Sequence, residues 1–416
     1  MLHTTHYKIK EISEVINGST PSTKEEDNYD GDIIWLTPKD LSDQRTKYIY
    51  QGERNITKKG YDSCGTKMIP PDNIIMSSRA PIGLLSINKN ECCTNQGFKS
   101  LILNKNLADT NYMYYFIKHH MPQIEALGSG TTFKEVSKDS MENYEIDIPD
   151  LLTQKKIADV LSCIDDKIAL NNKTNTELEN MAKTIYDYWF TQFDFPDKNG
   201  QPYKTSGGQM VYNETLKREI PAGWEVGKLG LYLENFGDGI HGTPEYDDSG
   251  EYYFINGNNL GNKLISFYSD TLKVNDEEYE KIQRPLNENT ILLSINGTLG
   301  SISFYNGEKI SIGKSACFLN VTEKEFKPFI YQILCSEKFQ KYMYTVASGS
   351  TIKNFAPRQA ADFDIPIPPK DLLEQFYNTT YSYLENQIKN EKENKELTKL
   401  HDYLLPLLMN GQIEVK

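Results

Sequence analysis

The chain has 416 residues and a net charge of −13, with 38% apolar and 25% charged residues. This composition is typical of two or three folded domains, and it excludes a single small module. The acidic balance also excludes a general nucleic-acid coat, because nonspecific affinity for nucleic acid comes from Lys and Arg that neutralise phosphates. It leaves open a protein that reads DNA through a local surface or beside a basic partner.

The sequence also argues against a membrane protein and against a disulfide-rich secreted protein. No run reaches the roughly 18 apolar residues that a membrane helix needs, and the first residues lack the apolar core of a secretory signal. The six cysteines show no CxxC spacing and are too few for a disulfide scaffold in a chain of this length. We therefore expect a cytoplasmic protein with reduced cysteines, no membrane contact and no metal site.

Residues 1–150 alternate short apolar runs with turns rich in Gly, Asn and Pro, and this pattern predicts strands. The run at 74–76 is one example. Between residues 111 and 127 the apolar and aromatic residues are spaced as in a helix. The segment is therefore predicted to be a mixed α/β domain that ends at Pro149.

The pattern then changes to a long amphipathic helix within the segment 151–220. Its inward positions recur at alternating steps of four and three, which is the spacing of a coiled-coil seam. The predicted seam consists of Ile157, Leu161, Ile164, Ile168, Asn171, Asn175, Leu178 and Ile185. The two Asn residues form polar layers of the kind that set the register of paired helices. We interpret the aromatic run at 186–195 as packing at the end of this helix.

The segment 221–369 repeats the first domain in the same order. The clearest match pairs GSGTTFKEVSKDSMENYEIDIP with ASGSTIKNFAPRQAADFDIPIP, so that Thr132 matches Thr351 and Lys134 matches Lys353. A second amphipathic helix then occupies the segment 370–416. Its predicted seam consists of Leu384, Ile388, Leu397, Leu400 and Leu404. Several matches in one order indicate an internal duplication.

Both long helices are polar at mid-length, and these polar layers meet only if the helices pair in antiparallel fashion. The predicted fold class is therefore α+β, with two similar mixed α/β globular domains separated by a pair of long antiparallel coiled-coil helices. The alternative is that each helix packs on its own globular domain alone. The order of domain, helix, domain and helix predicts an internal pseudo-two-fold repeat.

Motifs for catalysis and cofactor binding are absent from the sequence. It contains no GxxxxGK[ST], GxGxxG, GxSxG or HExxH motif, so we expect no catalytic site, no cofactor and no metal. Each half does contain a loop of Ser, Gly, Thr and Lys, which suits a backbone phosphate through NH, hydroxyl and ammonium groups. Two such domains held by paired helices are suited to two separated half-sites on a duplex.

Five segments carry a family resemblance: GSTPSTKEEDNYDGDIIWLTPKDLS, SSRAPIG, NQGFKSL, the run from SGTTFKEVS to IPDLLTQKKIADVLSCIDDKI, and IPAGWEVGKLG. With them, the whole chain resembles the specificity subunit of Type I restriction-modification systems. The resemblance implies target recognition domain 1 over 1–150, a central spacer helix and aromatic linker over 151–220, target recognition domain 2 over 221–369 and a C-terminal spacer helix over 370–416.

The same resemblance implies a role and partners. It implies a non-catalytic subunit that reads a bipartite site on double-stranded DNA and serves in defence against foreign DNA. It also implies assembly with adenine methyltransferase subunits and, in a larger complex, with ATP-dependent restriction subunits. We expect two methyltransferase copies because the repeat offers each docking surface twice. A specificity subunit of a related Type II system, a protein-only coiled-coil adaptor and a self-contained nuclease or methyltransferase are the alternatives.

Candidate DNA contacts follow from general DNA chemistry. Arg79 is predicted to contact guanine, with a structural salt bridge as the alternative, and Asn256, Asn258 or Asn259 is predicted to contact adenine. The candidates for phosphate contacts are Lys39, Lys99, Lys134, Lys314, Lys353 and Arg358. Thr37, Thr132, Asn296 and Thr351 complete the candidate set. Because NGNN at 256–259 replaces TPKD at 37–40, and Asn296 replaces Arg79, we expect two unlike half-sites.

Overall fold

The computed structural model describes residues 3–43, 46–79, 81–129, 134–261, 263–350 and 352–415. The chain divides into two compact units, Met1–Leu170 with Asn394–Lys416, and Asn171–Glu393. Each unit contains one globular domain and a part of each long helix. The predicted fold class, with two similar mixed domains and two long helices, is confirmed. The domain boundaries inferred from the sequence stay a prediction.

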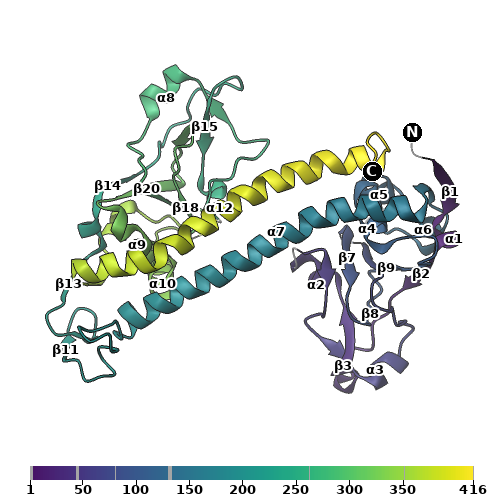
Figure 1. The fold of residues 1–416 in the computed structure, drawn as a ribbon, viewed down its shortest axis with the longest axis horizontal. Helices are drawn as coiled ribbons and strands as arrows, with labels where there is room; N and C mark the ends of the chain where they lie inside the picture. Colours follow the sequence, from purple (N-terminus) through teal and green to yellow (C-terminus); the bar gives the residue numbers. More distant parts are fainter. Residues whose placement is uncertain are drawn as a thin grey trace. The chain divides into compact units, whose positions relative to one another are not determined.

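Besides a two-stranded sheet formed by its first and last strands, the globular part of the first unit contains a larger and a smaller sheet among its described residues (Figure 1). The larger sheet has the order β2-β9-β6-β7-β4, and the smaller one has the order β5-β3-β8. The bounds of these strands are β2 (Ser13–Asn17), β3 (Tyr29–Leu36), β4 (Tyr48–Ile49), β5 (Asn55–Ile56), β6 (Ile74–Ser78), β7 (Ile82–Asn88), β8 (Cys93–Thr94) and β9 (Lys99–Leu103). The predicted strand at 74–76 lies within β6, which is buried along its whole length.

The helices of this domain are mostly short. They are α1 (Ile9–Ile12), α2 (Pro38–Asp43), α3 (Lys58–Asp62), α4 (Thr110–His119), α5 (Met121–Ala126) and α6 (Lys138–Glu142). The helical pattern at 111–127 forms α4 and α5, with Pro122 in the first turn of α5. Because proline has no N–H, it suits the start of a new helix better than the interior of a continuous one. Tyr112 and Tyr115 from α4 are buried in the main apolar core of the unit.

The second unit repeats this plan. Its sheets have the orders β14-β20-β17-β18 and β16-β15-β19 among the described residues. The strands are β14 (Leu233–Asp238), β15 (Tyr252–Ile255), β16 (Lys273–Val274), β17 (Thr290–Ser294), β18 (Ile302–Phe304), β19 (Ile310–Ile312) and β20 (Ala316–Val321). The helices are α8 (Asp276–Ile282), α9 (Lys327–Cys335), α10 (Glu337–Val346) and α11 (Pro357–Ala361). A hairpin of β11 (Met210–Asn213) and β12 (Arg218–Pro221) precedes the domain.

In each globular domain the last strand pairs with the first strand. In the first unit, β1 (Thr4–Lys8) pairs antiparallel with β10 (Glu145–Pro149), and Tyr7 lies opposite Ile146. In the second unit, β13 (Glu225–Lys228) pairs in the same way with β21 (Asp364–Ile367), and Val226 lies opposite Pro366. A long helix follows directly after the second strand of each pair, so both copies of the repeat deliver their helix from the same place.

The two long helices are α7 (Leu151–Tyr186) and α12 (Lys370–Met409). In the second unit, Asn175 Nδ2 donates to Glu391 Oε1 at 3.0 Å, and Asn171 Nδ2 donates to Glu393 Oε2 at 2.8 Å. Gln387 Nε2 donates to the backbone carbonyl of Asn175 at 2.8 Å. The partner numbers on α12 fall as those on α7 rise, so the helices run antiparallel there.

Burial agrees with the predicted seam on α7 and contradicts it at one position on α12. The eight seam residues named on α7 are all buried or half-buried, and so are Leu384, Ile388, Leu397 and Leu404 on α12. Leu400 is 45% exposed, so its assignment to the seam is wrong. His401, which is 4% exposed, occupies the inward position instead. Polar residues therefore fill seam positions along α12, and Thr380, Gln387 and Asn394 are further examples.

Aromatic residues pack where α7 ends in a short π-helical turn, η2 (Asp187–Thr191). The ring of Phe190 lies 5.1 Å from that of Phe376 on α12 and 4.8 Å from that of Phe329 on α9, measured between centroids. Trp189 also packs against Phe376, at 5.9 Å. The structure therefore supports the interpretation of this aromatic run as packing.

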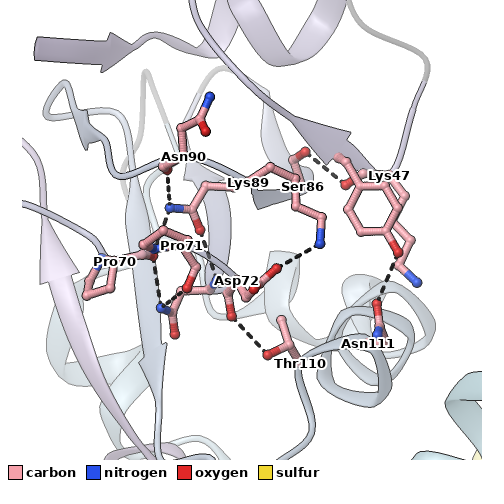
Figure 2. A network of polar contacts seen from close by, with 12 residues as sticks. Lys47, Pro70, Pro71, Asp72, Ser86, Lys89, Asn90, Thr110 and Asn111 are labelled. Atoms are coloured by element: carbon pink, nitrogen blue, oxygen red, sulfur yellow. Dashed lines mark hydrogen bonds and ion pairs between the residues drawn. The ribbon is translucent and has the colours of Figure 1, made fainter.

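A polar network fixes one end of the larger sheet in the first unit. Figure 2 shows Lys89, which follows β7, paired with Asp72 at 2.8 Å, and Thr110, the first residue of α4, donating its hydroxyl to the carbonyl of Asp72 at 2.9 Å. The hydroxyl of Ser86 donates to the carbonyl of Lys47 at 3.0 Å. These contacts join β7, the turn before β6, and α4.

The side chain of Lys47 is buried against α7. Its Nζ donates to Ser162 Oγ at 2.8 Å and to Tyr115 OH at 3.2 Å, and Tyr115 OH donates to Asp165 Oδ2 at 2.7 Å. Burial disfavours the charged amine and lowers the pKa of Lys47 to about 8, although Asp165 partly opposes this shift. The amine is therefore charged at neutral pH at a cost to folding.

We expect Lys47→Met to change how stability depends on pH. The folded state releases the Lys47 proton near pH 8, whereas the unfolded chain holds it to about pH 10.4. The stability of the natural chain relative to Lys47→Met should thus rise by about 1–2 kcal/mol between pH 8 and pH 10. Urea unfolding at both pH values measures this difference. The exposed Lys118→Met is the control, and an equal pH response in both variants would contradict the expectation.

Candidate nucleic-acid interface

The Ser-Gly-Thr-Lys loops close in the same way in both units. In the first unit, the backbone N–H of Ser129 donates to the carbonyl of Glu135 at 3.1 Å, and the reverse bond measures 3.0 Å. In the second unit, Ser348 and Asn354 exchange the same pair of bonds, at 2.9 and 2.8 Å. These residues occupy equivalent positions in the sequence repeat. The duplication has therefore preserved the backbone bonds that close the loop as well as its composition.

Each loop docks on the end of a buried strand. The N–H of Val136 donates to the carbonyl of Ser78, at the end of β6, with a distance of 3.0 Å. The N–H of Phe355 donates to the carbonyl of Ile295, just after β17, at 2.8 Å. The next residues, Arg79 and Asn296, form backbone bridges with the loops. The structure thus brings each predicted loop together with Arg79 or Asn296, which occupy equivalent positions in the two halves.

Charged side chains cluster at this point in the first unit. Arg79 is 38% exposed, and its Nη1 lies 4.0 Å from Glu135 Oε2. The other carboxylate oxygen, Glu135 Oε1, lies 3.1 Å from Lys99 Nζ. Lys99 is only 7% exposed and also donates to Ser78 Oγ at 3.4 Å. The assignment of Lys99 as a phosphate contact is therefore wrong, because its amine is buried and paired.

The TPKD segment of the first unit forms a helix cap. The backbone N–H and the hydroxyl of Thr37 both donate to Asp40 Oδ2 at 2.7 Å, at the start of α2. Lys39 is exposed and forms an ion pair with Glu53 at 2.7 Å. Thr37 thus uses its hydroxyl within the fold, and Lys39 is placed where a phosphate can compete for it. The spacing of Thr37 and Asp40 is the sequence signal of a capping box.

The NGNN segment of the second unit performs the same structural task. The backbone N–H of Asn256 donates to Asn259 Oδ1 at 2.8 Å, as Thr37 does to Asp40. Asn259 is 4% exposed, and its Nδ2 donates to the carbonyl of Ser266 at 2.8 Å. The assignment of Asn259 to an adenine contact is therefore wrong, because its amide is buried and saturated. Asn256 is half-buried and accepts from Ser315 Oγ, whereas Asn258 is exposed.

The remaining candidates differ in exposure. Lys134 and Lys314 are exposed, and Lys353 and Asn296 are half-buried. Arg358 is 75% exposed and forms an ion pair with Asp362 at 3.1 Å. Thr132 and Thr351 lie outside the described residues. In the described part of the chain, no group of three His, Cys, Asp or Glu side chains is placed to hold a metal ion.

Comparison with known proteins identifies the family to which this chain belongs. The family model described as "Type I restriction modification DNA specificity domain" matches residues 3–180 and again residues 221–399. The chain therefore belongs to this family and contains two copies of its domain. It is a specificity subunit of the Type I restriction-modification class, which recognises DNA and is not the catalytic component.

Individual relatives agree with this assignment. The chain is 32% identical to the Type I restriction enzyme MjaIX specificity subunit of Methanocaldococcus jannaschii over 98% of this chain and 93% of that protein. It is 26% identical to the HindI specificity subunit of Haemophilus influenzae over 68% of this chain and 72% of that protein. The fold matches the S subunit of the Type I system of M. genitalium, with a TM-score of 0.62, 16% identity and coverage of 98% and 96% of the two chains.

Two further findings concern membrane-spanning helices and the cysteine thiols. Within the ranges that the structure describes, no helix is long and apolar enough to cross a membrane. The six cysteines are all free thiols, and the pKa values of the three buried ones, Cys92, Cys93 and Cys317, are raised by burial. A raised thiol pKa reduces the reactive thiolate at neutral pH.

Proposed function

We propose that this chain reads a bipartite, asymmetric site on double-stranded DNA, with one half-site for each globular domain. The observation that carries the proposal is the pair of loops that close identically on equivalent strand ends. These loops present Arg79 and Glu135 in one unit, and Asn296 and Asn354 in the other. A shared frame with unlike polar side chains suits two domains that read different bases. Recognition would take place in the cytoplasm, where the free thiols stay reduced.

The remaining candidate residues fall into two groups, those proposed to contact bases and those proposed to contact phosphates. We propose that Arg79 contacts guanine, and that Asn258 or Asn296, whose amides are at least partly accessible, contacts adenine in the second half-site. For phosphate contacts we propose the side chains that are exposed or half-buried, which are Lys39, Lys134, Lys314, Lys353 and Arg358. Backbone contacts of this kind set the position of the protein on the duplex, and base contacts supply the specificity.

We also propose that two adenine methyltransferase subunits dock on the chain and that ATP-dependent restriction subunits join the complex. Each unit contains a groove at an equivalent position, of about 360 Å³ in the first unit and about 490 Å³ in the second. Equivalent residues of the repeat line both, and the pairs are Tyr112 with Phe329, Phe116 with Ile333, His120 with Glu337 and Ile146 with Ile365. A duplicated groove supports a partner that binds twice.

Substituting the loop lysines separates a DNA reader from a protein-only adaptor. In the complex with its methyltransferase, Lys134→Ala with Lys353→Ala should lower affinity for the duplex at least about tenfold. It should also reduce the slope of log K against log salt by about 2, one for each phosphate contact removed. Fluorescence anisotropy with labelled duplex at several salt concentrations measures both quantities.

The control for this experiment is Lys118→Ala, which removes an exposed lysine of α4 that belongs to neither loop. The isolated chain, with its net charge of −13, should bind the same duplex more weakly than the complex does. Unchanged affinity and unchanged salt slope in the double variant would favour the adaptor. A related Type II system would pass this test as well, and the presence of a restriction subunit in the purified complex distinguishes the two.

A further inference from the structure

The charged cluster in the first unit contains one side chain that faces solvent and one that is buried. Arg79 is 38% exposed, Glu135 is 40% exposed and Lys99 is 7% exposed. The carboxylate of Glu135 lies between the two cations, with Oε1 at 3.1 Å from Lys99 Nζ and Oε2 at 4.0 Å from Arg79 Nη1. The contacts therefore run from the buried amine to the carboxylate and then to the guanidinium, and the last two groups are about equally exposed.

The backbone fixes both ends of the outer pair. Arg79 and Glu135 face each other across a backbone bridge, and Glu135 is also bridged to Ser129. The buried lysine neutralises the carboxylate from the inside, so Glu135 has one oxygen free to orient the guanidinium on the outside. An arginine that contacts a base needs a fixed plane for its two parallel hydrogen bonds, and each rotamer it loses on binding costs affinity. A carboxylate that holds the guanidinium beforehand reduces that cost.

The equivalent positions in the second unit carry no charge. Asn296 and Asn354 replace Arg79 and Glu135, and they form the same backbone bridge. Ser315 replaces Lys99, and its hydroxyl donates to Asn256 Oδ1 at 3.0 Å. The two domains thus share a backbone frame and differ in whether a held cation faces outward.

We propose that Glu135 and Lys99 are positioning residues that hold the Arg79 guanidinium for recognition of a guanine in the first half-site. This inference rests on the proposed function. The second domain, with amides in place of the charged pair, has no guanine requirement at the corresponding base pair. Lys99 thereby acquires a role that differs from the phosphate contact predicted from the sequence, since it acts through Glu135 and never meets the DNA.

Base-modification sequencing of cells that carry the methyltransferase and variants of this chain tests the proposal. Arg79→Ala should relax one base pair of one half-site by about tenfold or more, the range of a bidentate arginine contact. Glu135→Gln should relax the same base pair by a smaller factor of about three to ten, because Arg79 remains but is no longer held. Glu125→Gln, the same exchange at an exposed position of α5, should leave that base pair unchanged and thus serves as the matched control.

A second variant distinguishes the positioning of Arg79 by Glu135 from the contribution of Glu135 to folding stability. In Glu135→Gln alone, Lys99 is left buried without its counter-charge, and the melting temperature should fall. Adding Lys99→Met removes that charge and should restore the melting temperature, whereas the relaxed base preference should persist. Recovery of both properties, or a uniform fall in methylation with no change in any base preference, would overturn the proposal. If the unaltered chain directs no methylation, the proposed function itself fails, and this outcome is visible before any variant is compared.

Discussion

Phe376→Ala is expected to lower the free energy of unfolding of the second unit by about 4 kcal/mol. The side chain is fully buried on α12, and the rings of Tyr186, Trp189 and Phe190 lie 5.1–6.4 Å from it, measured between centroids. Truncating a buried Phe removes its apolar surface from the core and leaves a cavity that the neighbours fill only in part. Because α7 and α12 meet here, the loss should appear as weaker cohesion of the two helices.

Urea unfolding followed by tryptophan fluorescence measures this loss, because Trp189 and Trp224 both pack in the aromatic cluster of the second unit. Tyr403→Ala is the control on the same helix, since Tyr403 is 67% exposed. We expect the control to change stability by less than about 0.5 kcal/mol. Equal unfolding midpoints for both variants would mean that the cluster does not hold α12 in the second unit.

Glu179→Ala is the second large effect that we expect, with a loss of about 3 kcal/mol from the second unit. Glu179 lies on α7, and its Oε2 is 2.9 Å from Lys263 Nζ. Tyr331 OH donates to Oε1 at 3.3 Å, and Gln387 Nε2 donates to Oε2 at 3.2 Å. Lys263 is only 15% exposed, so removing the carboxylate leaves a buried ammonium without a counter-charge.

A double-mutant cycle tests this explanation. Glu179→Leu with Lys263→Met replaces the buried ion pair by apolar side chains, and it should recover most of the stability lost in Glu179→Ala. Urea unfolding of Glu179→Leu, Lys263→Met and the double variant gives the coupling free energy. A double variant as unstable as the sum of the singles would show that the two side chains act independently, contrary to the structure.

The features that could be predicted from the sequence are those that repeat along the chain. The duplication, the change to a helical spacing after Pro149 and the polar layers at Asn171 and Asn175 together indicated the two units and the antiparallel helices. The seam on α12 was harder, because polar residues fill several of its inward positions. The leucine pattern predicts Leu400 in the seam, whereas the buried residue is its neighbour His401.

The candidate DNA contacts show why single positions were less predictable. Lys99 pairs with Glu135, which lies 36 residues further along the chain, and no local pattern reveals such a pairing. Asn259 was mistaken for a base contact because an amide that caps a turn has the same side chain as one that reads adenine. The comparison of TPKD with NGNN contained the missing signal, since both segments place a side-chain acceptor three residues after the N–H that it binds.

The most direct test of the central claim is base-modification sequencing of DNA from cells that express the methyltransferase with and without this chain. We predict methylated adenines in a two-part motif, with unlike halves and a fixed spacer, only when the chain is present. Methylation that is identical in both strains, although the methyltransferase binds the chain, would contradict the claim that these two domains select the DNA sequence.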